Sequence, residues 1–350
     1  MTRMMKSRCL LAVAALVAAK SCGAHPDVSA ASAAGLVEKY NPGHYVAISE
    51  RETVSGIQHL DEPALRGVSR RYYWADLEPK EGVYDFAAIR QDLEFLKKHH
   101  KQLVVFITDK TFSAGRNPLP NYLAQYALPN LRGYTAKRWD PVVAARLVAL
   151  ARALAAEFDS QTNFEGMAFQ ESALMISPAV QRQEGYTPDK YRDALIKILT
   201  ESAAAFRQSR VFWYMNHLEG DDGKLAEVAE ALVHSRVVMG GPDILPFRKR
   251  LQPTYQLYDR FHGRLKLFCS AQEDSYRHDR NDSRNMGNAA TVRNQPPPTD
   301  GYVPMDQIFL FARDHLHVNY LFWTYKNYRG NPGSFNYDNA LAVMRKYPSF

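Results

Sequence analysis

The sequence predicts an α/β protein with the (β/α)8 architecture of a TIM barrel, formed by a single domain. Apolar, β-branched or aromatic runs of strand length recur along it, each followed by a polar loop and a stretch with helical periodicity. Eight strands that alternate with helices are the pattern of such a barrel. The expected strands are His44–Ser49, Leu65–Tyr73, Gln102–Thr108, Phe164–Gln170, Arg210–Met215, Arg236–Gly240, Leu265–Ala271 and Val318–Thr324.

Three of the intervening helices are clearest. In Ala87–His99 the apolar residues recur at spacings of three and four, which predicts one buried helix face. The segments Pro141–Phe158 and Pro188–Gln208 are rich in residues with high helix propensity, and Asp140 is a suitable N-cap for the first of them. Functional residues of a barrel built in this way are expected at the C-terminal ends of its strands.

The N-terminal residues 1–24 have the three parts of a secretion signal: a basic start, an apolar middle and a run of small residues. The apolar middle is shorter than the roughly 20 residues that a membrane span needs. We expect cleavage near Ala24, which leaves residues 25–350 as a secreted or periplasmic barrel domain. A lipoprotein signal is the alternative, with Cys22 as the lipid anchor, although Lys20 inside the small-residue run counts against it.

Loss of the signal changes the charge of the chain. The signal contains four basic residues and no acidic residue, so the formal charge falls from +7 to +3 when it is removed. The high positive charge was the main argument for a nucleic-acid partner, which is therefore not expected. Of three cysteines only Cys269 is sure to remain, so the domain depends on its core rather than on a disulfide. No zinc-type cysteine spacing, Walker loop or dinucleotide fingerprint is present, and we expect a monomer without cofactor or metal.

The segment Tyr72–Phe86 (YYWADLEPKEGVYDF) joins a strand end to a surface turn and a helix start. It resembles the second strand and loop of retaining glycoside hydrolases of clan A, in which W-x-x-x-E-P-x-x-G-x-Y-x-F recurs. That resemblance implies a barrel that cleaves glycosidic bonds, with catalytic glutamates at the ends of strands four and seven. The segment's own Glu78 and Glu81 are expected to serve the turn and the helix entry.

Glutamates stand at both of these strand ends. Strand four reads NFEGMAFQESAL and ends at Glu171, whereas Glu165 lies at its opposite end. Strand seven reads RLKLFCSAQEDSY and ends at Glu273, whose neighbour Asp274 must point to the other side of the strand. Retention needs two carboxyl groups roughly 5 Å apart. By resemblance, Glu171 is the general acid/base and Glu273 is the nucleophile.

Further residues are expected to bind the sugar. The resemblance places Trp323 beneath the sugar ring, where an aromatic face packs against apolar hydrogens; the alternative is a core tryptophan, and Trp74 has the same ambiguity. Gln170 takes the position of the asparagine that the clan usually has. The other expected substrate contacts are Asp109, Asn216, His217, Asp243, Tyr72 and Arg71.

Two connections, 109–140 and 274–301, are long enough to form substrate walls on the catalytic face; for the second, a flexible surface loop is the alternative. We therefore expect an exported glycoside hydrolase that attacks a polysaccharide or oligosaccharide, endo-acting, by double displacement. Because Gln170 replaces the asparagine that the clan usually has, an alternative function remains: a barrel that binds glycans without cutting them, as part of a polysaccharide assembly system. His217 and Asp243, which follow adjacent strands, keep open a metal-assisted hydrolase or deacetylase.

Overall fold

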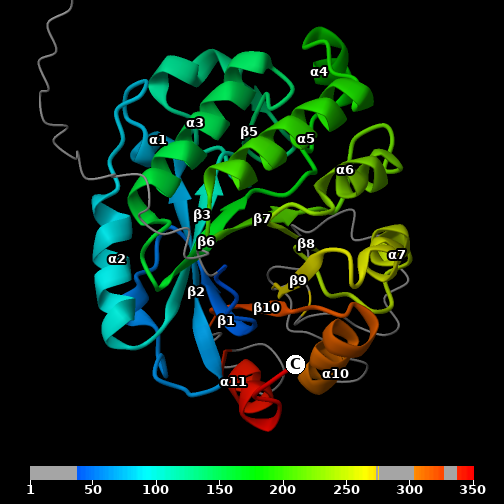
Figure 1. Cartoon of the computed structure of the whole chain (residues 1–350). Coiled ribbons are helices and arrows are strands. Elements are labelled where there is room, and N and C mark those ends of the chain that lie inside the picture. The colour runs from blue at the N-terminus through cyan, green and yellow to red at the C-terminus, as the bar shows by residue number, and fades with distance from the viewer. Residues whose placement is uncertain (1–37, 273–274, 276–302, 327–336) are drawn as a thin grey trace, which may run out of the picture. The chain divides into compact units, whose positions relative to one another are not determined.

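Eight parallel strands close into a barrel in the order β1-β10-β9-β8-β7-β6-β3-β2 (Figure 1). The computed structural model describes residues 38–272, 275, 303–326 and 337–350. Every predicted strand is present with ends within two residues of those expected, which confirms the TIM barrel. The strands are β1 (Gly43–Ile48), β2 (Leu65–Tyr73), β3 (Gln102–Thr108), β6 (Phe164–Phe169), β7 (Arg210–Tyr214), β8 (Val237–Gly241), β9 (Lys266–Ala271) and β10 (Tyr320–Thr324).

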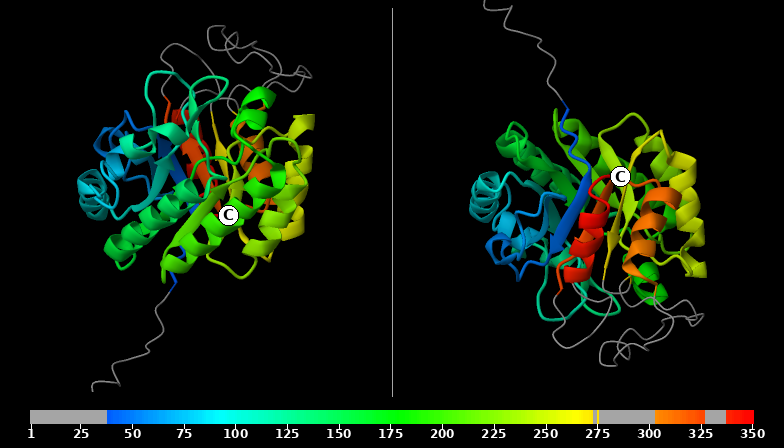
Figure 2. Two further views of the ribbon diagram at one scale, coloured as in Figure 1. Left: turned by 90° about the horizontal axis from the view of Figure 1, so that it is seen from above. Right: turned by 90° about the horizontal axis from the view of Figure 1, so that it is seen from below.

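Helices lie outside the strands in both views of Figure 2. The Asp140 side chain accepts a hydrogen bond from the Val142 amide and caps α3, as the sequence predicts. In the described part of the chain, no helix has the length and apolar character needed to cross a bilayer. The helices are α1 (Trp74–Leu77), α2 (Ala87–Lys98), α3 (Pro141–Phe158), α4 (Pro178–Gln183), α5 (Pro188–Ala205), α6 (Lys224–Leu232), α7 (Gln252–Phe261), α10 (Met305–Leu310) and α11 (Tyr337–Lys346).

Aromatic side chains fill the barrel interior. The ring of Phe212 is edge-on to Phe268 and Phe322, with centroids 5.5 and 5.6 Å apart. Gly240 leaves room for this packing, because a Cβ atom there would lie 2.0 Å from the Phe268 carbonyl oxygen. The interior is therefore a packed core. Its members are Tyr45, Val104, Phe106, Ala168, Phe212, Tyr214, Val238, Phe268, Tyr320 and Phe322.

A second core lies between the strands and the helices and contains a buried histidine. The Trp323 indole donates to Nδ1 of His44 at 3.0 Å, and Nε2 of His44 lies 2.7 Å from the carbonyl oxygen of Tyr347. These two contacts assign the neutral tautomer with its proton on Nε2. His44 is fully buried, and this burial lowers its pKa to about 4.

The first long connection is ordered. It contains the short helix η2 (Asn121–Tyr126) and an antiparallel pair of strands, β4 (Ala127–Pro129) and β5 (Tyr134–Ala136). The Thr111 amide donates to the Tyr134 carbonyl at 2.8 Å, so this hairpin holds the chain that follows β3. The predicted signal segment, including Cys22, lies outside the described residues, as does nearly all of the second long connection.

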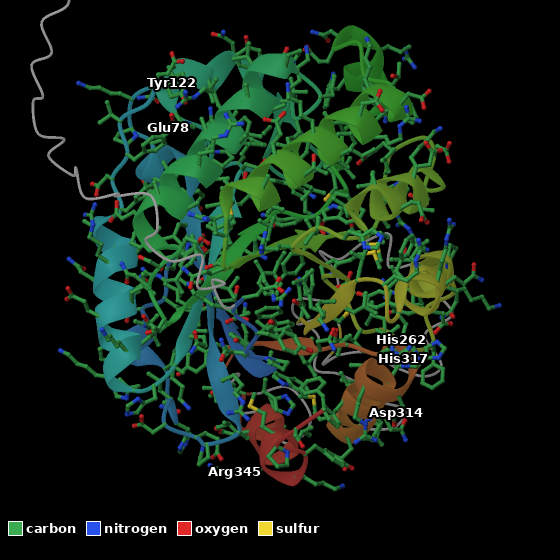
Figure 3. All side chains as sticks on the ribbon, viewed as in Figure 1. Glu78, Tyr122, His262, Asp314, His317 and Arg345 are labelled. Carbon is green, nitrogen blue, oxygen red and sulfur yellow. The ribbon has the colours of Figure 1, made fainter. Side chains whose placement is uncertain are left out.

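The turn of the YYWADLEPKEGVYDF segment is organised by Glu78 (Figure 3). Its carboxylate accepts from the Trp74 indole at 2.9 Å and from the Gly82 amide at 3.0 Å, and it pairs with Arg146 of α3. Arg146 also donates to the hydroxyl of Tyr122 at 3.1 Å. Glu78 thus serves the turn, as predicted, and does not face the barrel mouth.

His44 should make the stability of the fold depend on pH. Between pH 6.5 and 4 the unfolded chain binds a proton at this residue that the folded chain excludes, so the free energy of unfolding falls as the pH falls. The contribution is about 3 kcal/mol, at about 1.4 kcal/mol per pKa unit. Urea denaturation of wild type and His44→Gln at pH 7 and pH 4 should show the smaller loss in the variant. An equal loss in both proteins would contradict this assignment.

Candidate active site

Glu171 lies at the barrel mouth, two residues beyond the end of β6. Its Oε1 atom accepts from Nζ of Lys110 at 2.6 Å, and its Oε2 atom accepts from Nδ2 of Asn216 at 2.7 Å. Lys110 follows β3 and Asn216 follows β7, the two strands that pair with β6. Only 13% of the Glu171 side chain is exposed. Three neighbouring strands therefore fix both oxygens of this carboxylate.

Lys110 is the member of this group that the sequence analysis missed. Its side chain has no exposed surface, donates to the Ala173 carbonyl at 2.5 Å, and holds Nζ 4.7 Å from the ring centre of Phe112. Burial lowers the pKa of Lys110, against the opposing effect of the Glu171 carboxylate. The period of two along β3 could have identified it, because Lys110 is in phase with the interior residue Phe106.

The same alternation turns Asp109 away from the mouth. Asp109 is 1% exposed and forms two hydrogen bonds of 2.7 Å with Arg138. Arg138 in turn donates to the Glu171 carbonyl at 2.7 Å and to the hydroxyl of Tyr191 at 3.1 Å. The expected substrate contact at Asp109 is therefore corrected: this residue is half of a buried ion pair that supports the main chain at Glu171.

Gln170 links three strands. Its Oε1 atom accepts from Nη1 of Arg71 at 3.1 Å, and its Nε2 atom donates to the Lys110 carbonyl at 3.0 Å. The Arg71 guanidinium lies 4.2 Å from the ring centre of Phe106. Gln170 is only 3% exposed, so its amide joins protein groups on both sides. The structure thus brings Gln170 and Arg71 together beside Glu171, and their contact with substrate stays a prediction.

Asn216 is oriented by the loop that follows β6. The backbone N–H of Asn216 donates to the Ser172 hydroxyl at 3.0 Å. Its side-chain oxygen accepts from the backbone N–H of Ala173 at 3.1 Å. These contacts leave the Nδ2 group of Asn216 directed at Glu171. Asn216, predicted as a substrate contact, is in this structure a direct partner of the predicted acid/base.

His217 and Asp243, the two residues on which the metal-assisted alternative depends, follow the neighbouring strands β7 and β8. Nδ1 of His217 is 2.6 Å from Oδ1 of Asp222, and this hydrogen bond raises the pKa of His217. Asp243 follows β8, is partly exposed, and its carbonyl lies 3.3 Å from Sγ of Cys269. In the part of the chain that the structure describes, no three His, Cys, Asp or Glu side chains are grouped as metal ligands would be.

Three expected aromatic contacts belong to the outer core instead. Trp323 and Trp74 are fully buried, and their indoles donate to His44 and Glu78. Tyr72 is 5% exposed and its hydroxyl donates to Asp92 of α2. Neither tryptophan offers a face to a sugar. The sequence could not reveal this, because both sides of a barrel strand are apolar.

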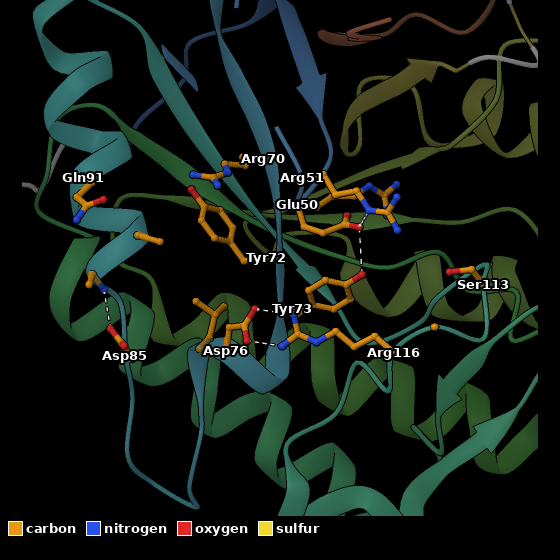
Figure 4. A pocket seen from close by; sticks show the side chains of 15 residues that line it. Glu50, Arg51, Arg70, Tyr72, Tyr73, Asp76, Asp85, Gln91, Ser113 and Arg116 are labelled. Atoms are coloured by element: carbon orange, nitrogen blue, oxygen red, sulfur yellow. Dashed lines mark hydrogen bonds and ion pairs between the residues drawn. The ribbon is translucent and has the colours of Figure 1, made fainter. Parts of the chain in front are cut away.

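A cleft of about 690 Å3 lies on the rim beside this group, over the ends of β2, α1 and α2 (Figure 4). Arg71 lines it and therefore joins it to Gln170. On its wall the guanidinium of Arg116 packs 4.2 Å from the ring centre of Tyr73 and pairs with Asp76. The predicted nucleophile Glu273 and its neighbour Asp274 lie outside the described residues.

No protein family model matches the chain, and no curated protein matches it in sequence. Among solved structures, an endogalactoceramidase superposes with a TM-score of 0.52 at 13% identity, over 83% of this chain and 72% of that one. A β-galactosidase from Bacillus circulans sp. alkalophilus gives 0.55 at 9% identity, over 89% of this chain and 56% of that one. GH5_18 from Streptomyces cattleya, in complex with GlcNAc, gives a TM-score of 0.53 at 12% identity, over 88% of this chain and 80% of that one. The chain thus shares its barrel fold with glycoside hydrolases.

Removing one partner of the buried Asp109–Arg138 pair should be strongly destabilising. Arg138→Met leaves Asp109 without its counter-ion, and a loss of about 3–5 kcal/mol is expected in the free energy of unfolding. The double variant with Asp109→Leu should recover much of that loss. The control is Arg152→Gln, which breaks an exposed pair with Glu201 and should change stability by at most about 1 kcal/mol. Equal effects of Arg138→Met and Arg152→Gln in urea denaturation would contradict the prediction.

Proposed function

We propose that this protein is a glycoside hydrolase that cleaves glycosidic bonds with retention, using Glu171 as general acid/base and Glu273 as nucleophile. The main support is the Glu171 carboxylate, which stands at the C-terminal end of the barrel's fourth strand between Lys110 and Asn216. Active sites of such barrels lie at this end. The barrels of an endogalactoceramidase and of a β-galactosidase have the same fold.

The reaction has two displacements. In the first, a carboxylate oxygen of Glu273 bonds to the anomeric carbon while the glycosidic C–O bond breaks, and Glu171 protonates the departing oxygen. In the second, water bonds to the same carbon, its proton passes to Glu171, and the bond to Glu273 breaks. This exchange requires the two carboxyl groups to lie roughly 5 Å apart.

The substrate we propose is a polysaccharide or oligosaccharide outside the cytoplasm, attacked at internal bonds. The rim cleft supports this proposal, because Arg71, Tyr73 and Arg116 line it and its volume of about 690 Å3 offers room beyond a single sugar at the mouth. The N-terminal residues 1–24, which read as a secretion signal, support the location.

A glycan-binding barrel that does not cut its ligand is the second candidate. One observation favours it: Glu171 forms an ion pair with Nζ of Lys110 at 2.6 Å, whereas a general acid must begin with a proton. Binding of a polysaccharide without release of reducing ends would establish this function instead.

Glu171→Gln and Glu273→Gln should each lower the rate of cleavage by about 100-fold to 10,000-fold. Each substitution removes a group that changes its protonation or bonding during the reaction. The measurement is the release of reducing ends from a panel of polysaccharides. Glu201→Gln is the control, since this exposed residue of α5 lies on the outer surface and should leave the rate unchanged. Full wild-type turnover in both active-site variants would exclude the double-displacement assignment.

A further inference from the structure

The contacts of Lys110 account for most of its hydrogen-bonding capacity. Of its three N–H groups, one points to Oε1 of Glu171 at 2.6 Å and one to the Ala173 carbonyl at 2.5 Å. The ring of Phe112 lies 4.7 Å from Nζ, and the side chain has no exposed surface. Lys110 and Glu171 are therefore a closely coupled pair shielded from solvent on the lysine side.

Two further charged groups act on Lys110, one of them in an ion pair. Arg138, which follows β5, is held by two hydrogen bonds to Asp109. Glu219, which follows β7, accepts from the Met175 amide at 2.6 Å, and its second oxygen has no hydrogen-bond partner in the described part of the chain. At the 2.6 Å contact between Lys110 and Glu171, one proton can reside on Nζ or on Oε1.

The position of that proton decides whether Glu171 can act as an acid. With a positive Lys110 at 2.6 Å, the proton is on the lysine, and an ionised Glu171 has none to give. Burial disfavours the charged form of Lys110 and lowers its pKa, which makes the neutral amine easier to reach. Transfer along the short contact would then leave a protonated Glu171 beside an uncharged amine.

We propose that Lys110 is the positioning residue that stores the proton which Glu171 delivers to the leaving group. This inference rests on the proposed glycoside hydrolase function. In the first displacement one proton moves from Nζ to the Glu171 carboxylate and on to the departing oxygen, which leaves a neutral Lys110. In the second, the proton of the attacking water returns through Glu171 to Lys110. Each turnover therefore restores the original ion pair.

Two substitutions separate proton storage from packing. Lys110→Met keeps an unbranched side chain that is shorter only by the terminal nitrogen, and it removes the proton, whereas Lys110→Arg keeps the charge but cannot release a proton. Both variants should lose about 100-fold or more in kcat toward glycosides with sugar or alkyl leaving groups. Both should stay within a few-fold of wild type toward 2,4-dinitrophenyl glycosides, because that leaving group departs without protonation.

The matched control is Lys101→Met. Lys101 is also a buried lysine, at the opposite end of β3, where it donates to the carbonyls of Glu62 and Leu65 at 2.8 and 2.6 Å. Its replacement should affect both classes of leaving group equally. Equal losses on both classes in the Lys110 variants, or no loss in either variant, would overturn the inference while leaving the glycoside hydrolase function intact.

A second measurement needs no activity. Carbon NMR of the Glu171 carboxyl group follows its ionisation directly in wild type and in Lys110→Met. We expect the titration of this carboxyl group to shift between the two proteins, because only wild type places Nζ of Lys110 2.6 Å from Oε1. Identical titration curves would contradict the coupling. If wild type released no sugar while this shift was present, the proposed function would fail and the coupled pair would stand.

Discussion

Successive side chains on a barrel strand point alternately inwards and outwards, and this constraint decides which residues reach the mouth. Along β3 and the two residues that follow it, this alternation places Phe106 in the packed interior, Lys110 on the same side at the strand end, and Asp109 on the side of Arg138. In β10 it places Phe322 inside and Trp323 in the outer core. The packed aromatic interior then leaves only the strand ends available for chemistry.

The barrel itself could be predicted because its strands and helices differ in period. Apolar runs indicate the eight strands, and apolar spacings or high helix propensity indicate three of the helices between them, so the two kinds of signal support one another. The orientation of single residues was harder to predict. The barrel interior and the outer core are both apolar. The residue types in YLFWT therefore do not indicate which of Phe322 and Trp323 points into the barrel. The sequence favours Asp109 as the substrate contact because a carboxylate can bind sugar hydroxyls, whereas the residue in phase with Phe106 is Lys110.

The candidate site shows how the barrel gives one carboxylate a defined environment. Lys110 and Asn216 come from the strands on either side of β6 and each fixes one oxygen of Glu171. Behind them the buried Arg138 binds the Glu171 carbonyl, and Gln170 ties the same segment to Arg71. A carboxylate held by this many donors has little freedom to turn.

The separation of two carboxyl groups tests the proposed mechanism most directly. A crystal structure that defines Glu273 would give the distance between its carboxyl group and that of Glu171 without any need to know the sugar. The double-displacement mechanism predicts about 5–5.5 Å, with both groups facing the barrel mouth. A separation of about 6.5–9.5 Å, or a Glu273 side chain turned away from the mouth, would contradict it.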